Sequence, residues 1–172
     1  MRPVELGLPT DDLSGVSTLY LPDAEVFVVN AWVYEDNARW GRVYARRRNE
    51  GRYWAVQPPP PQRSDACALA ISPSEVAILR QVGTRTPNGW GFRSVEILRV
   101  DFMRNASRVL ILPSAEESWV VSIEGADVQG RYVYATVGRP GATSHRHCYS
   151  VERIDWESGE MVPMMDLPAI WA

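Results

Sequence analysis

Short apolar runs separated by turn-forming residues make up most of the chain. The runs are rich in Val, Ile, Tyr, Trp and Phe, whereas Pro, Gly, Asn and Asp gather between them. Each run is about four to eight residues long, the usual length of a β-strand. No stretch keeps apolar residues at helical spacing through three turns. The pattern therefore predicts an almost all-β chain.

The last third of the chain shows this pattern most clearly. Four apolar runs of strand length lie there, at 119–123, 131–137, 148–156 and 161–167. Turn-rich segments separate them, and the longest is at 138–144. Four strands joined in this way form an antiparallel meander.

Motifs recur at intervals of about fifty residues, which indicates an internal repeat. The motif LYLPDAEV at 19–26 is followed by LAISPSEV at 69–76. In the same way, RVDF at 99–102 is followed by RIDW at 153–156. The meander is therefore expected to occur three times.

Each unit is expected to end in an apolar closing strand followed by proline. VLILP at 109–113 and VPMMDLP at 162–168 are such strands, and VELGLP at 4–9 resembles them. We expect a single all-β domain in which a lone strand precedes three units, at 1–15, 16–61, 62–117 and 118–172. The strands of the first two units are expected at 18–21, 26–34, 39–47 and 52–57, and at 67–71, 76–83, 91–102 and 108–112. Prolines 58–61 form a stiff connector between units, with a polyproline ligand as the alternative.

A four-stranded meander has two apolar faces and cannot bury both alone, so repeated units must stack. Radial stacking predicts a β-propeller-type repeat, and the alternative is a single β-sandwich or barrel. Inner strands would be buried on both faces and read as continuous apolar runs, as at 26–29 and 119–123. Outer strands would be more mixed, as at 46–48 and 152–153. We expect Trp119 and Trp156 to pack between units.

The third unit resembles the blades of bacterial β-propellers of the TolB-like and YVTN-like kinds. The matching segments are GRYVYA at 130–135 and RIDWESGE at 153–160. The first unit departs from this pattern, because Arg46 and Arg47 stand where the Ile-Asp pair is expected. The resemblance implies a blade fold and specifies no activity.

Three units do not close a propeller ring, which has four to eight blades. We expect two chains to complete a six-bladed ring as a homodimer, with a piece of a longer propeller as the alternative. The closing strand at 4–8 would then compete with the one at 162–167, so one of them must lie elsewhere.

Composition restricts the classes of partner. The formal net charge is -3 and the pI is near 5.4, so we expect no nucleic-acid partner. The one basic and aromatic patch, Arg46 to Arg48 with Trp54 nearby, is interpreted as a solvated strand and turn. No signal peptide and no membrane span are recognised, which predicts a cytoplasmic protein without membrane contact. Cys67 and Cys148 are expected to be reduced, buried thiols, with one disulfide as the alternative.

His145, His147 and Cys148 are the densest cluster of metal-ligand types. Imidazole and thiolate suit zinc, but no further Cys or His in this part of the chain supplies a fourth ligand. The other interpretation is a polar loop that leads into a strand, and we expect no cofactor.

Function is weakly specified by the sequence. No nucleophile elbow, P-loop or dinucleotide fingerprint is present. We expect a non-catalytic interaction or ligand-binding β-propeller module that acts as an oligomer and has a protein or carbohydrate partner. The alternative is an enzyme, or part of one, that uses loop carboxylates on carbohydrate or lactone substrates. The ligand-contacting candidates are Trp32, Trp40, Trp54, Trp90, Glu35 and Asp36.

Overall fold

The computed structural model describes residues 13–35, 38–56, 63–86, 89–112, 119–127, 129–140 and 147–167. These ranges contain twelve strands and no helix, so the all-β prediction is confirmed. Among these residues no helix is long and apolar enough to span a membrane. The expected closing strand at 4–8 and prolines 58–61 lie outside the described ranges.

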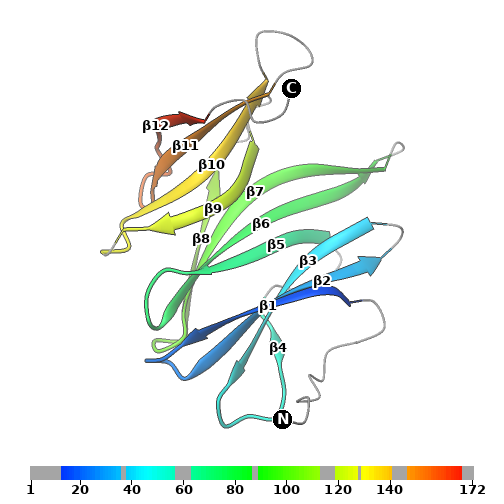
Figure 1. Ribbon diagram of the computed structural model, residues 1–172, viewed down its shortest axis with the longest axis vertical. Helices are drawn as coiled ribbons and strands as arrows, with labels where there is room; N and C mark the ends of the chain where they lie inside the picture. The colour runs from blue at the N-terminus through cyan, green and yellow to red at the C-terminus, as the bar shows by residue number, and fades with distance from the viewer. Residues whose placement is uncertain are drawn as a thin grey trace.

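The strands form three separate four-stranded antiparallel sheets, each a meander of consecutive strands (Figure 1). Sheet 1 contains β1 (Leu13–Leu21), β2 (Val26–Glu35), β3 (Ala38–Arg47) and β4 (Trp54–Ala55). Sheet 2 contains β5 (Arg63–Ala70), β6 (Glu75–Thr86), β7 (Gly89–Asp101) and β8 (Ala106–Leu112). Sheet 3 contains β9 (Trp119–Ala126), β10 (Tyr132–Pro140), β11 (His147–Asp155) and β12 (Met161–Leu167). None closes into a barrel, and the alternative of a single sandwich or barrel is wrong.

Sheet 2 lies between the other two sheets and is buried on both of its faces (Figure 1). Val76 and Ile78 of β6 belong to a core shared with sheet 1, and the alternate residues Ala77 and Leu79 belong to a core shared with sheet 3. All four side chains are at most 6% exposed. Trp156 is also buried in the second core, as expected for packing between units. The side chain of Trp119 is outside the described side chains.

The predicted meander order of strands is confirmed, but the apolar and mixed runs lie in other strands than expected in two respects. The apolar run at 119–123 lies in β9, which pairs only with β10 and is an edge of sheet 3. The mixed segments expected in outer strands belong to β3 and β11, each of which has a neighbour on both sides. Glu152 is fully buried in β11. The physical reason is that burial here follows from stacking of whole sheets, so a central strand can carry charge on one face.

One backbone hydrogen bond recurs in all three sheets and confirms how the repeats align. The residue after the third strand donates its N–H to the carbonyl of the residue before the second strand. These pairs are Arg48 to Glu25, Phe102 to Ser74 and Trp156 to Arg131, with N···O distances of 2.7, 3.1 and 2.9 Å. Arg47 therefore occupies the place of Asp101 and Asp155.

The two aspartates explain why this motif repeats in sheets 2 and 3. Asp101 Oδ1 accepts the N–H groups of Met103 and Arg104, and Asp155 Oδ1 accepts those of Glu157 and Ser158. Aspartate commonly stabilises a turn by accepting hydrogen bonds from backbone N–H groups a few residues later. The N–H groups of Ser158 and Glu157 lower the pKa of the Asp155 carboxyl below its usual value. The Asp155 carboxylate therefore stays ionised and accepts these hydrogen bonds until the pH of the solution falls through this lowered pKa.

Candidate ligand-binding cleft between sheets 1 and 2

The outermost strand of sheet 1 is much shorter than its counterparts. β4 has two residues, whereas β8 and β12 have seven each. β4 pairs only with Tyr44 and Ala45 of β3. It therefore leaves part of β8 uncovered on the side that faces sheet 1, where Val109 and Ile111 are 45% and 66% exposed. These two residues share that face because they pair with Leu98 and Glu96, and Leu98 belongs to the first core.

A cleft of about 570 Å³ opens at this place. Trp54 and Val56 line it from sheet 1, and Leu98, Val100 and Phe102 line it from sheet 2. Trp54 is 36% exposed, so its ring stands at the mouth rather than in the core. The polar lining residues are Arg47, Glu50, Asp101, Asn105 and Ser107.

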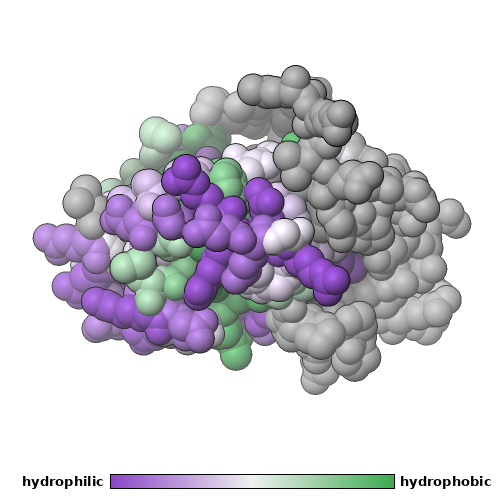
Figure 2. Space-filling view, turned by 90° about the horizontal axis from the view of Figure 1, so that it is seen from below, coloured by the Kyte–Doolittle hydropathy of each residue, from purple (hydrophilic) through white to green (hydrophobic). Residues whose placement is uncertain are grey.

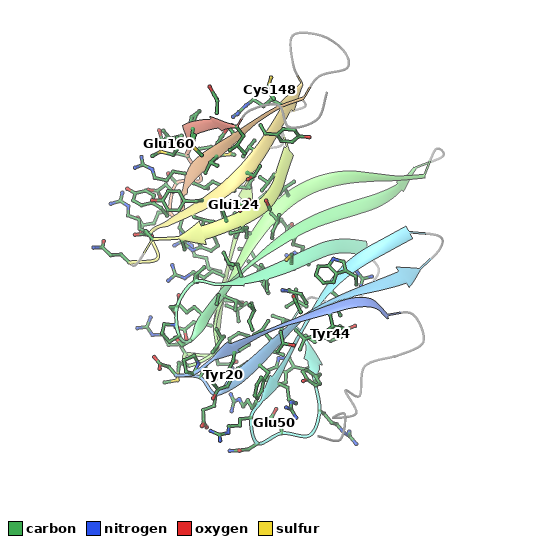
Figure 3. The ribbon with its side chains drawn as sticks, viewed as in Figure 1. Tyr20, Tyr44, Glu50, Glu124, Cys148 and Glu160 are labelled. Atoms are coloured by element: carbon green, nitrogen blue, oxygen red, sulfur yellow. The ribbon has the colours of Figure 1, made fainter. Side chains whose placement is uncertain are left out.

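A second hollow of about 440 Å³ adjoins the first along the β3–β4 connection. The two hollows share Arg47, Glu50 and Phe102. Figure 3 places Glu50 at the lower end of sheet 1, in the loop that leads into β4. Together the two hollows offer two aromatic rings, two guanidinium groups, three carboxylates and neutral hydrogen-bonding groups.

This set of groups is suited to binding a ring-shaped, hydroxyl-rich molecule. An indole face packs against the C–H face of a sugar ring, and charged and amide groups exchange hydrogen bonds with its hydroxyls. Asp101 is already used in its turn, because its Oδ1 accepts two backbone N–H groups. Among the described residues that line the cleft there is no His or Cys to act as a general base or nucleophile.

Of the two predicted ligand-contacting residues whose side chains the structure describes, Trp32 and Trp54, Trp54 lines the cleft. Trp32 and Trp40 lie toward the β2–β3 hairpin, where Trp32 pairs with Gly41 and Val33 pairs with Trp40. Glu35 ends β2 at the same hairpin, and Trp90 pairs with Arg85 near the β6–β7 hairpin. The side chains of Glu35, Trp40 and Trp90 and all of Asp36 lie outside the description. Backbone positions thus separate Trp54 from the other candidates.

Two of the predicted zinc ligands, His147 and Cys148, lie at one end of sheet 3. His147 begins β11, where it pairs with Pro140, and Cys148 pairs with Arg139. Figure 3 shows Cys148 at the upper end of this sheet. His145 and the side chain of His147 lie outside the description, so the zinc site stays a prediction. Within the described part of the chain, no three His, Cys, Asp or Glu residues are grouped as metal ligands.

Cys67 and Cys148 form no disulfide, but the expected burial of both is wrong. Cys67 lies in the edge strand β5, and Cys148 lies near the hairpin end of β11. Both are exposed. Cys67 alternates with Ala66 and Ala68, which belong to the first core, so its side chain lies on the other face of β5.

Two buried charged clusters between the sheets were missed from the sequence. Arg80, which is 9% exposed, donates from Nε to Glu96 Oε2 at 2.9 Å. Glu152 is fully buried, is paired with Arg139, and accepts a hydrogen bond from Ser150 at 2.9 Å. Glu152 shares a face with Ile154, two residues away, and that alternation was the available signal. Each pair joins neighbouring strands of one sheet, β6 to β7 in sheet 2 and β10 to β11 in sheet 3.

Comparison with known proteins gives no relative for this chain: no protein-family model and no curated protein sequence matches it.

Proposed function

We propose that this chain is a non-catalytic ligand-binding module whose three sheets are blades of the β-propeller type and which acts as an oligomer. The cleft beside Trp54 holds a small, hydroxyl-rich ligand such as a sugar. The TolB-like and YVTN-like resemblance of the third unit supports the blade interpretation, as does the stacking of sheets through two cores.

The position of Trp54 is the observation that carries the ligand proposal. A tryptophan ring that is partly exposed at the mouth of an apolar cleft with a polar rim is costly to leave in water, and a stacked ligand removes that cost. The neighbouring groups have both signs of charge, Arg47 and Glu50, which favours a polar neutral ligand over a simple ion.

Ligand titration with the Trp54→Ala variant tests this function. Binding of soluble neutral oligosaccharides, such as cellotriose and maltotriose, would be followed by tryptophan fluorescence and calorimetry. We expect one of them to bind the native chain and to lose at least about tenfold in affinity when Trp54 is replaced.

Met164→Ala is the matched control, because it removes an exposed apolar side chain from the outer strand of a different sheet. It should leave the affinity unchanged. Equal binding by Trp54→Ala and the native chain would contradict the assignment of the cleft. Cleavage of the oligosaccharide during the titration would contradict the non-catalytic role.

A further inference from the structure

In both contacts between sheets, equivalent residues of the second strand face the next sheet. The same positions identify the face of sheet 3 that would meet a further sheet. Val26, Glu75 and Tyr132 begin the second strands of the three sheets and are equivalent positions. Counted from these residues, sheet 1 presents Val28 to sheet 2, and sheet 2 presents the equivalent Ala77 to sheet 3. The equivalent residue in sheet 3 is Tyr134, on the face turned away from sheet 2. We call this the outward face of sheet 3, and it consists of Tyr132, Tyr134, Thr136, Val151 and Arg153.

A backbone carbonyl completes each contact between sheets. The carbonyl two residues before the second strand accepts a hydrogen bond from the preceding sheet. Pro73 accepts from the N–H of Asp23 at 3.1 Å, and Gly130 accepts from Arg99 Nη1 at 2.5 Å. The equivalent carbonyl in sheet 1 belongs to Ala24.

Arg99 is the side chain that joins sheet 2 to sheet 3. Its Nε is 2.9 Å from Glu75 Oε2, and its guanidinium lies 6.0 Å from the ring centre of Trp156. Arg153 occupies the equivalent position in sheet 3. There Tyr132 takes the place of Glu75, and the Arg153 guanidinium lies 4.5 Å from the centre of the Tyr132 ring. Arg153 is thus held on the outward face, in the position from which Arg99 reaches the next sheet.

The opposite end of the stack carries the complementary surface. We call it the receiving face of sheet 1, and it consists of Val16, Tyr20, Phe27, Tyr44 and Arg46. Val16 and Tyr20 are each 43% exposed, and Arg46 lies 5.3 Å from the ring centre of Phe27. Figure 2 views the molecule from this end and shows hydrophobic side chains between hydrophilic ones.

Composition and charge make the two faces suited to each other. Both present tyrosine and arginine, which are enriched at protein interfaces, whereas the buried residues of the two internal cores are aliphatic except for Trp156. Arg131 and Arg153 flank Tyr132 at the lower end of the outward face. The turn before β2, which would meet them, carries the exposed acids Asp23 and Glu25.

We propose that the outward face of sheet 3 packs on the receiving face of sheet 1 of a second copy, with Arg153 donating to the Ala24 carbonyl of that copy. Two such contacts join two copies head to tail and close a ring of six sheets. This proposal depends on the oligomeric part of the proposed function and is independent of the ligand in the cleft.

Mass measurements on the full chain and on variants of each face test the contact. The native chain should sediment as a dimer at micromolar concentration. Arg153→Glu, which places a carboxylate opposite Asp23 and Glu25, should weaken dimerisation by at least about tenfold. Tyr20→Asp should do the same from the receiving face. Arg104→Ala is the control, since its side chain is 82% exposed in a turn outside both faces, and it should leave the dimer intact.

Mixing the two variants identifies the arrangement. A pair formed by one Arg153→Glu copy and one Tyr20→Asp copy retains one contact between unaltered faces, whereas pairs of either variant alone retain none. The mixture should therefore associate more tightly than either variant. Circular dichroism and oligosaccharide binding at the cleft show that each variant is folded. A monomeric native chain, or a mixture no tighter than its components, would overturn the proposal even if ligand binding persists.

Discussion

At the scale of single residues, Gly130 lies in direct contact with sheet 2, because its carbonyl accepts a hydrogen bond from Arg99 Nη1 at 2.5 Å. Its φ is +65°, in the left-handed region that favours glycine. A Cβ at this position would lie 2.6 Å from Arg99 Nη2, the group that joins the two sheets. The residue is therefore glycine for two separate physical reasons.

Gly130→Ala should lower the free energy of unfolding by about 1–3 kcal/mol, because it adds left-handed strain and displaces the Arg99 guanidinium. Chemical denaturation measures this change. Gly51→Ala is the control, since a Cβ there meets nothing within 4 Å, and it should change stability by less than about 0.5 kcal/mol. Equal stability of the two variants would contradict the role of Gly130.

Prediction from the sequence was uneven at this scale. The packing role of Trp156 follows from its type and its place beside a turn, and the structure confirms it. The partner of Glu152 could not be predicted, because Arg139 lies thirteen positions away and only pairing of β10 with β11 brings them together. Nothing in the sequence separates Trp54 from the other tryptophan candidates for the site.

At the scale of elements, β5 is the strand that touches both neighbouring sheets. It lies against β2 and β3 of sheet 1 and against β9 of sheet 3. In its contact with sheet 1, the Asn30 side-chain amide forms hydrogen bonds with the β5 backbone, as a neighbouring strand would. Asn30 Nδ2 donates to the Ala68 carbonyl at 3.0 Å, and the Ala68 N–H donates to Asn30 Oδ1 at 2.7 Å.

Asn30→Ala should cost about 2–4 kcal/mol of unfolding free energy, because it leaves two backbone groups of Ala68 without these partners in a buried place. Thermal and denaturant unfolding would measure the loss. Ser17→Ala removes only the longer contact of Asn30 Nδ2 with Ser17 Oγ, at 3.4 Å, and should be nearly neutral. An equally small effect of both changes would show that Asn30 does not hold the sheets together.

Most strands were predicted from the sequence because turn residues mark their ends. β12 matches its expected range, and β7 begins two residues earlier and ends one residue earlier than expected. β4 was expected at 52–57 but occupies only Trp54–Ala55. The length of β4 is set by how many of its residues form hydrogen bonds with β3, and the apolar content of the local sequence does not predict that number. The cleft follows from this shortened strand, so it could not have been predicted either.

At the scale of the whole molecule, the described contacts run from each sheet to its neighbour. Each core joins two adjacent sheets, and sheet 2 contributes to both. Stability in such a stack is the sum of what each unit and each contact contributes. The middle of sheet 2 should therefore be the most stable part of the described chain.

Amide hydrogen exchange should show the strongest protection at residues 76–79 of β6, which are buried on both faces. The amides of β12 should exchange much faster, because it is an edge strand in which Met164 and Met165 are 55% and 56% exposed. The comparison is internal and uses one sample. Equal protection in the two strands would mean that the stack opens as a single unit.

Pro73 and Gly130 each offer a main-chain oxygen to the preceding sheet, and this has a consequence for how such a chain can change in sequence. Pro73 and Gly130 share no side-chain chemistry, yet both supply the same oxygen to the preceding layer. The residue type at this position can thus differ between units, because the backbone carbonyl still accepts the hydrogen bond that orients one sheet against the next. Duplicated layers of this kind can continue to stack long after comparison of their residues has ceased to reveal a common origin.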